Sequence, residues 1–224
     1  AIQHYQKALE IAREQGYKLD ETDLYLVLGH ACRLHNEYQT AIQHYEKALE
    51  ITRKQGYKFE EIDAYIGLGH AYELNSQYQM AIQHYDNAME ISREQGYKLQ
   101  ETQAHLRIGD AYRLDNEYQT AIQHYEKALE ITRKQGYKFE EIDAYIGLGH
   151  AYELNSQYQM AIQHYDNAME ISREQGYKLQ ETQAHLRIGD AYRLDNQYQT
   201  AIQHHEKALE IAREQGYKQE EARA

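Results

Sequence analysis

The chain has 224 residues, with 23 tyrosines, no proline and no tryptophan, and a formal net charge of −12 at neutral pH. Such acidity argues against a nucleic-acid-binding protein, which needs cationic patches to neutralise phosphates, and against attachment to anionic membranes. No apolar run is long enough to cross a bilayer, and the single cysteine, Cys32, has no disulfide partner. The composition therefore predicts a cytoplasmic protein with neither nucleic-acid nor membrane partners.

Long blocks of the sequence are repeated. Residues 41–80 recur unchanged as residues 121–160, and residues 81–120 recur as residues 161–200 with one difference, at Glu117. The blocks resemble one another at a period of 40 residues, nested inside the 80-residue duplication. Self-similarity at such a period is typical of a solenoid, in which each repeat buries its apolar face against its neighbours. Function must then be sought in the residues that vary between repeats.

The repeats organise the whole chain, 1–224, as a single predicted array. Because the chain starts within a repeat and does not begin with methionine, we expect it to be a piece of a longer protein. Neither terminal helix has the polar capping helix that terminal repeats normally need, so we expect self-association through the uncapped ends. In chain order the predicted parts are a half repeat at 1–19, repeats at about 20–59, 60–99, 100–139, 140–179 and 180–219, and a partial helix at 220–224.

One repeat predicts two helices. Apolar residues of 41–55 recur at helical spacing, and Gly56 follows at the place of a left-handed C-cap, with Tyr57 positioned to fold back on the last turn. A second helix is expected over 59–74, with apolar residues on several sides, as suits an inner helix. Its central glycine, Gly69, costs about 1 kcal/mol relative to alanine in a helix. We therefore expect close helix contact there, opposite the small residues Ala81 and Ala88.

These residues carry a family resemblance. The segment L-G-H-A-Y at Leu68–Tyr72, followed by Tyr78, Ala81, Tyr85 and Ala88, resembles the signature of the tetratricopeptide repeat (TPR) family. The likeness extends over essentially the whole chain. The terminal proline of the motif is absent, with Arg93 in its place, and the 40-residue period exceeds the usual 34. In this respect the chain is similar to the long TPRs of spindle-orientation adaptors and kinesin light chains.

The resemblance implies an all-α, right-handed TPR superhelical solenoid of antiparallel helix pairs. It also implies a non-catalytic protein–protein interaction scaffold that binds an extended peptide or partner in its concave groove. One stripe of the inner helices would line that groove. We expect its charge to alternate, with acidic repeats that contain a glycine-lined depression at Gly67 and Gly147 and arginine-bearing repeats between them. The candidate groove residues are Asp23, His30, Arg33, Asp63, His70, Glu73, Arg107, Asp110, Arg113, Asp143, His150, Glu153, Arg187, Asp190 and Arg193.

The sequence offers little support for catalysis or for a bound metal or cofactor. A histidine recurs at one position of every repeat, from His4 to His204, but equivalent positions of stacked helices lie about 10 Å apart. Zinc needs ligands about 2 Å from one centre. We therefore interpret these histidines as packing residues and the many carboxylates as a solvated helix face. Nucleophile motifs and phosphate-binding glycine loops are also absent from the sequence.

Two further inferences concern partners. The TPRs that bind chaperone C-termini hold a carboxylate with a clamp of lysine, asparagine and arginine, whereas the corresponding stripe here carries aliphatic residues such as Leu26 and Ile66 in place of lysine. Chaperone C-termini are therefore not expected as partners. The near-perfect duplication also leaves an alternative from another class: a structural spacer or engineered tandem repeat array without a dedicated ligand.

Overall fold

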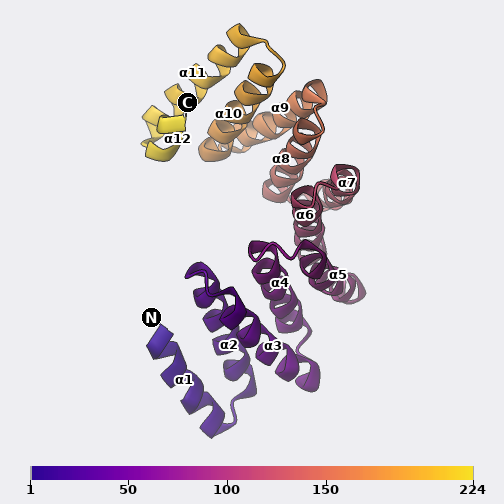
Figure 1. Ribbon diagram of the computed structural model, residues 1–224, viewed down its shortest axis with the longest axis vertical. Helices are drawn as coiled ribbons and strands as arrows, with labels where there is room; N and C mark the ends of the chain where they lie inside the picture. Colours follow the sequence, from indigo (N-terminus) through magenta and orange to yellow (C-terminus); the bar gives the residue numbers. More distant parts are fainter. Residues whose placement is uncertain (1, 224) are drawn as a thin grey trace. The chain divides into compact units, whose positions relative to one another are not determined.

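The structure, a computed structural model, describes residues 2–223. This part of the chain folds into twelve α-helices without a strand, joined by turns of two or three residues (Figure 1). The predicted all-α fold of successive helix pairs is confirmed. The helices are α1 (Ile2–Gln15), α2 (Lys18–Leu34), α3 (Tyr38–Gln55), α4 (Lys58–Leu74), α5 (Tyr78–Gln95), α6 (Lys98–Leu114), α7 (Tyr118–Gln135), α8 (Lys138–Leu154), α9 (Tyr158–Gln175), α10 (Lys178–Leu194), α11 (Tyr198–Gln215) and α12 (Lys218–Arg223).

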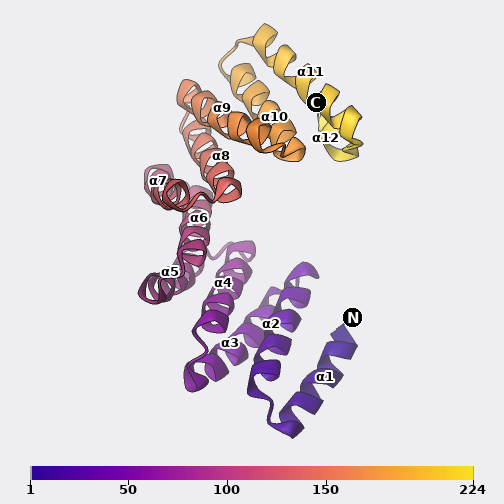
Figure 2. The same cartoon turned by 180° about the vertical axis from the view of Figure 1, so that it is seen from behind.

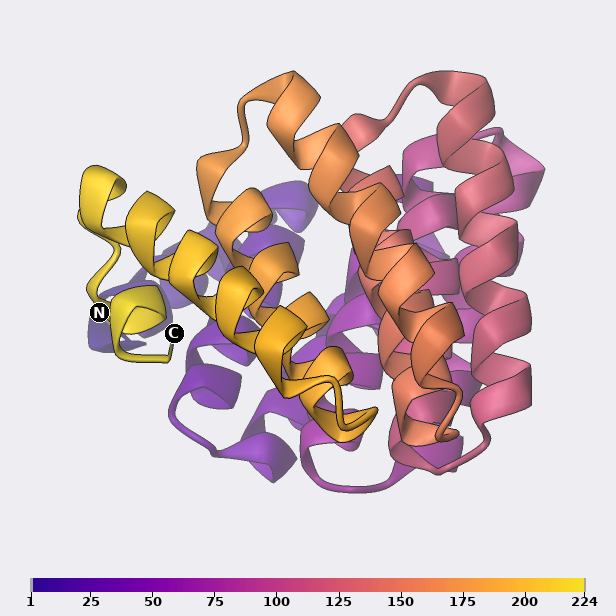
Figure 3. The same cartoon turned by 90° about the horizontal axis from the view of Figure 1, so that it is seen from above.

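The helices form two compact units. The first contains α1 to α6 and extends to Asp115, and the second begins at Asn116 and contains α7 to α12. Consecutive helices within each unit run antiparallel, as the views of Figures 1 and 2 show. The orange and yellow helices of the second unit can also be followed from above in Figure 3. None of the helices in residues 2–223 is long and apolar enough to cross a membrane.

Two kinds of turn end the helices. Gly56 has a positive φ of 77°, and Tyr57 N–H donates to the Thr52 carbonyl at 3.0 Å, which confirms the predicted glycine cap. The other turn places a non-glycine residue in the left-handed region, with Ser76 at φ 58° and Asn36 at φ 61°. Asparagine tolerates this region better than most residues. Because both turns are short, each helix folds back directly on the previous one.

The even-numbered helices are the inner helices of each unit. In the first unit α2 contacts α4 and α4 contacts α6, and in the second α10 contacts both α8 and α12. Within these units the odd-numbered, outer helices contact inner helices, but their backbones do not approach one another as closely. The helices thus lie closer together on the inner side than on the outer side. Each unit is therefore concave along its inner helices.

Aromatic rings fill the space over the central glycines. A Cβ added at Gly69 would lie 2.3 Å from the Tyr85 ring, and one added at Gly29 would lie 2.7 Å from the Tyr45 ring. The predicted close contact at these glycines is thus present, but its partner is a tyrosine ring and not an alanine of the facing helix. Absence of a Cβ lets the outer helix insert a large ring against the inner-helix backbone, which contributes more buried apolar area than an alanine would.

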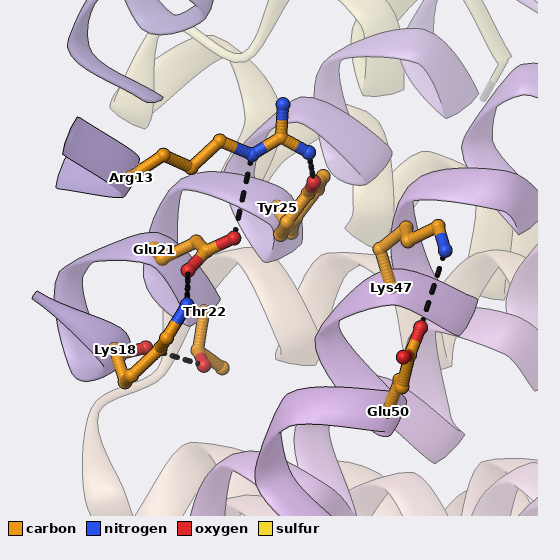
Figure 4. A network of polar contacts seen from close by, with 7 residues as sticks. All are labelled: Arg13, Lys18, Glu21, Thr22, Tyr25, Lys47 and Glu50. Atoms are coloured by element: carbon orange, nitrogen blue, oxygen red, sulfur yellow. Dashed lines mark hydrogen bonds and ion pairs between the residues drawn. The ribbon is translucent and has the colours of Figure 1, made fainter. Parts of the chain in front are cut away.

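In four repeats a buried glutamate links an outer helix to the inner helix that follows it. Glu21 on α2 is only 6% exposed. It accepts one hydrogen bond from Lys18 Nζ at 2.6 Å and another from Arg13 Nε of α1 at 3.3 Å (Figure 4). Arg13 also donates to the Tyr25 hydroxyl. The expectation that the carboxylates form only a solvated face is wrong at this position, because the glutamate neutralises two cations inside the helix junction. Buried equivalents are Glu61, Glu101, Glu141 and Glu181.

Candidate functional site

The predicted groove residues lie on the inner helices. In the first unit Asp23, His30, Asp63 and Arg107 are exposed on this face, whereas other members of the stripe are half-buried. The second unit keeps Asp143 and Arg193 exposed. The stripe is therefore a mixture of side chains that a ligand could reach and side chains that are already packed. The half-buried members are Arg33, His70, Glu73, Asp110, Arg113, His150, Glu153, Arg187 and Asp190.

Carboxylates of α2 and α4 gather near the N-terminal ends of these helices. Desolvation and the nearby charges of Glu60 and Asp23 raise the pKa of Asp63 to about 6. Desolvation, Glu60 and Asp20 also raise the pKa of Asp23. The structure thus brings Asp23 and Asp63, from successive repeats, into one electrostatic group. A cation or a cationic side chain near this group would lower both pKa values.

Further along α4, His70 and Glu73 surround the Tyr85 ring of α5. The Tyr85 hydroxyl donates to Glu73 Oε2 at 3.2 Å, and the His70 ring meets the tyrosine edge-on at a centroid distance of 5.7 Å. Burial, followed by the charges of Arg107 and Arg33, lowers the pKa of His70 to about 3. Burial and Asp110 raise the pKa of Glu73. His70 is therefore neutral and acts as a packing group at ordinary pH.

The second unit contains a copy of this cluster. The Tyr165 hydroxyl donates to Glu153 Oε2 at 3.2 Å, and the His150 ring lies 5.7 Å from the tyrosine ring. Burial raises the pKa of Glu153, while Arg187 and Arg193 act in the opposite direction. The same short-range contacts therefore form wherever the repeat sequence recurs.

Several arginines of the stripe form ion pairs with aspartates of their own helices. On α6, Arg107 and Arg113 lie 3.6 Å and 3.3 Å from the two carboxylate oxygens of Asp110. On α10, Arg193 lies 3.5 Å from Asp190. Sequence reasoning expected alternating acidic and basic repeats, but these pairs partly neutralise the basic ones. Arg33 differs, since its Nη2 contacts His30 Nδ1 at 2.9 Å.

The expected glycine-lined depression is filled. Gly67 is buried, and a Cβ at that position would lie 2.4 Å from the Tyr45 ring; Gly147 has the same relation to Tyr125. The prediction of an open depression there is wrong, because sequence spacing places the glycine on the inner helix but does not show which neighbouring ring reaches it.

One cavity does lie on the inner face of the second unit. It has a volume of about 130 Å³ and is bordered by α8, α10 and α12. Its walls combine two aliphatic side chains, an amide and two guanidinium groups, one of which belongs to the predicted stripe. The lining residues are Ile146, Gln183, Leu186, Arg187 and Arg223.

Sequence reasoning missed two larger grooves on the outer side. One of about 680 Å³ opens between α3 and α5 over Leu68 of α4, and its copy of about 510 Å³ opens between α7 and α9 over Leu148. Both have acidic and basic residues of the preceding outer helix along one side. The residues concerned carry no unusual motif. The grooves arise because the outer helices are spread apart, and this follows from helix packing and not from periodicity.

The recurring histidines pack against aromatic rings. His84 stacks on Tyr72 with ring centroids 5.1 Å apart, and burial lowers its pKa. In the last pair of long helices His204 meets His185, with the two Nδ1 atoms 3.2 Å apart. The predicted packing role is confirmed for these histidines, whereas His4 at the start of the series is exposed. Among residues 2–223 no three side chains of histidine, cysteine, aspartate or glutamate are arranged to hold a metal ion.

Several solved structures share this fold at low sequence identity. BtubC from P. vanneervenii has a TM-score of 0.83 at 18% identity, with coverage of 96% of this chain and 91% of that chain. The nearly identical TPR-like repeats of a putative kinesin light chain from Podosopora anserina give 0.73 at 18% identity, covering 86% and 95%. A Rap protein complexed with competence and sporulation factor gives 0.74 at 20% identity. The match covers 92% of this chain but 58% of that protein.

No curated protein matches the sequence. The sequence model of the tetratricopeptide repeat matches residues 1–54, 60–134 and 140–214. These segments include most of the chain, and the middle one spans both structural units. Together with the successive helix pairs, they show that the chain belongs to the tetratricopeptide repeat family.

Proposed function

We propose that the chain is a non-catalytic interaction scaffold whose inner-helix face binds an extended peptide or partner segment. The observation that carries this proposal is the run of accessible charged side chains along the concave face of a unit, from Asp23 and His30 on α2 to Arg107 on α6. Rigid helices hold these groups at fixed spacing, so the scaffold loses little conformational entropy when a ligand with matching charges binds. The solved Rap protein complex supports a partner-binding role for this fold.

The spacing of the cations suggests a test within the first unit. Arg33 on α2 and Arg107 on α6 lie on inner helices two apart, about 20 Å if neighbours pack about 10 Å apart, and their repeat positions differ by six residues, about 9 Å along the helix axis. Together these offsets give about 22 Å, and an extended peptide rises about 3.3 Å per residue. The best acidic peptide should therefore carry two carboxylates about six to seven residues apart. A library of peptides that differ only in this separation would be measured by fluorescence anisotropy.

Charge reversal provides the matched comparison. Arg107→Glu should weaken binding of the peptide with this spacing, whereas Lys47→Glu makes the same charge change on an exposed outer-helix residue and should not. Circular dichroism would verify that both variants keep their helicity. No preference for charge spacing, or equal effects of the two variants, would refute groove binding.

One observation favours the alternative of a structural spacer or engineered array without a dedicated ligand. Arg107, Arg113 and Arg193 are paired with aspartates of their own helices, and Glu73 accepts a hydrogen bond from Tyr85. Such internal pairing satisfies charged groups without a partner. A spacer should bind none of the library peptides above background, which distinguishes the two functions in the same experiment.

A further inference from the structure

We propose that the cavity between α8, α10 and α12, here called the α10 pocket, is a subsite for the carboxylate of an acidic side chain, with glutamate as the best fit. This inference deepens the proposed peptide-binding function and rests on it. The pocket is defined by Ile146, Gln183, Leu186, Arg187 and Arg223 and has a volume of about 130 Å³. That space suits one side chain and not a folded element.

The two arginines of the pocket differ from Arg107, Arg113 and Arg193 on the inner face, each of which pairs with an aspartate. Within the described residues, neither Arg187 nor Arg223 has a carboxylate oxygen within 4.0 Å, the limit for an ion pair. The charge of Arg187 acts to lower the pKa of Glu153, but the hydrogen bond that Glu153 accepts comes from the Tyr165 hydroxyl. By contrast Arg107, the copy of Arg187 in the first unit, lies 3.6 Å from Asp110. Within residues 2–223 the pocket thus contains two guanidinium groups without a carboxylate oxygen at ion-pair distance.

Sequence variation between repeats reinforces this assignment. Arg223 occupies the repeat position that is Asp23, Asp63 and Asp143 in some repeats and Gln103 and Gln183 in others. At this one position of the inner-helix stripe, an acid or amide has been replaced by a cation. The replacement places Arg223 beside Arg187 and Gln183 in the same pocket. An aspartate at this position favours a cationic ligand, whereas an arginine favours an anionic one.

The chemistry of the walls defines the ligand further. Guanidinium groups present planar pairs of N–H donors that match the geometry of a carboxylate, and the amide of Gln183 can donate as well. Ile146 and Leu186 supply apolar contact for the methylene groups of a glutamate side chain, and by excluding water they strengthen the charge interaction. A phosphate has no aliphatic portion to contact these walls. We therefore assign the pocket to a carboxylate on a short aliphatic stem.

The test uses the full chain with arginine side chains labelled with nitrogen-15, and N-acetyl-glutamate α-amide as the probe. Titration should give saturable shifts of the Nε–Hε signals of Arg187 and Arg223, followed by NMR, with little effect on Arg107. Arg187→Gln and Arg223→Gln should each weaken binding about tenfold, since each removes a charge-assisted hydrogen-bond donor. Lys127→Gln, which removes one cation from an exposed position of the outer helix α7, is the control and should leave the affinity unchanged.

Other probes decide between outcomes. The neutral amide, N-acetyl-glutamine α-amide, should cause no saturable shift. Inorganic phosphate that binds as tightly as the glutamate probe would overturn the assignment to a carboxylate, and equal shifts at Arg107 and Arg187 would show unspecific ion binding.

Saturable glutamate binding without any preference in the peptide library would refute the extended groove but keep the pocket. Spacing preference without glutamate-probe binding would refute the pocket alone.

Discussion

The Tyr85 ring lies so close to the Gly69 backbone that no side chain fits at that position without moving the ring. A Cβ at Gly69 would be 2.3 Å from the ring, and Gly149 has the same relation to Tyr165. Alanine is the better helix former by about 1 kcal/mol, so local preference alone would favour replacing the glycine. The tertiary contact opposes that preference. Glycine is retained at this position because it allows the ring to pack against the helix.

We predict that Gly69→Ala destabilises the chain by about 1–3 kcal/mol, because the added methyl group forces the Tyr85 ring to move within a packed core. Urea unfolding would measure the change. Adding Tyr85→Ala removes the clashing ring, so the double variant should lose less than the sum of the two single losses. A higher stability of Gly69→Ala than of the parent chain would contradict the role assigned to this contact.

His185 provides a pH prediction. Burial, then His204, lowers its pKa to about 4, against about 6.5 in an unfolded chain. Between these values the unfolded chain binds a proton that the folded chain does not, so stability is lost as pH falls from about 6.5 to about 4. The contribution is at most about 1.4 kcal/mol per pH unit. The groups that act on His185 are His204, Glu181, Lys207 and Arg173.

The repeats supply a suitable substitution for the test. Tyr65 and Tyr145 occupy the position of His185 in other repeats, each with its ring 6.0 Å from a histidine. His185→Tyr should therefore fold normally and show a smaller loss of unfolding free energy between pH 7 and pH 4.5. Above pH 7 the two proteins should respond to pH alike. Identical slopes at acid pH would show that protonation of this histidine does not contribute.

At the scale of elements, buried glutamates pair with an arginine of the preceding outer helix in four repeats. Glu21 joins cations from both sides of the α1–α2 turn, while Glu50 on α3 forms an exposed pair with Lys47 at 3.1 Å (Figure 4). Glu21 thus differs from Glu50 in two ways: it has a second cationic partner, and its side chain is 8% exposed against 72% for Glu50. Ion pairs between exposed side chains contribute little to stability because water screens them.

We predict that Glu21→Ala destabilises the first unit by about 1–3 kcal/mol, because it removes two hydrogen bonds between charged groups, Arg13 and Lys18 to Glu21. Glu50→Ala should cost at most about 1 kcal/mol, as is typical of an exposed pair. Thermal unfolding of the two variants, followed by circular dichroism, would compare them. Equal losses would mean that burial of Glu21 adds nothing to the junction.

At the scale of the whole molecule, the terminal helices expose residues that are core residues elsewhere. Ile202 on α11 is 49% exposed, whereas its counterpart Ile42 is 2% exposed. Tyr5 on α1 is 38% exposed, compared with 4% for Tyr45. These faces have the composition of an internal repeat interface, so they favour contact with another apolar face. The net charge of −12 opposes association, but screening limits that effect to about 8 Å at physiological salt.

We predict that the 224-residue chain self-associates through these end faces. Light scattering over a concentration series should show a mass that increases with concentration. Ile202→Glu should shift the series toward the monomer, while Leu74→Glu, at an exposed leucine away from the ends, should not. A monomeric mass at every concentration would refute association through the ends.

The amino-acid sequence by itself determined the helix pairs, the glycine caps and the family. Those features depend on local periodicity and on short-range steric preferences, and both recur with the 40-residue period. The candidate groove residues could also be assigned to one stripe of the inner helices, since helical spacing places them there. Whether that stripe binds a peptide stays a prediction.

Tertiary structure alone decided which of these side chains are available. It placed Tyr45 over Gly67, brought Arg13 of α1 to the buried Glu21 of α2, and left Arg187 beside Arg223. These outcomes depend on which residue of a neighbouring helix reaches a given position, and periodicity contains no information about that choice. The same repeated sequence therefore places Arg107 3.6 Å from Asp110 in one unit and its copy Arg187 beside Arg223 in the other, because packing decides which side chains become neighbours.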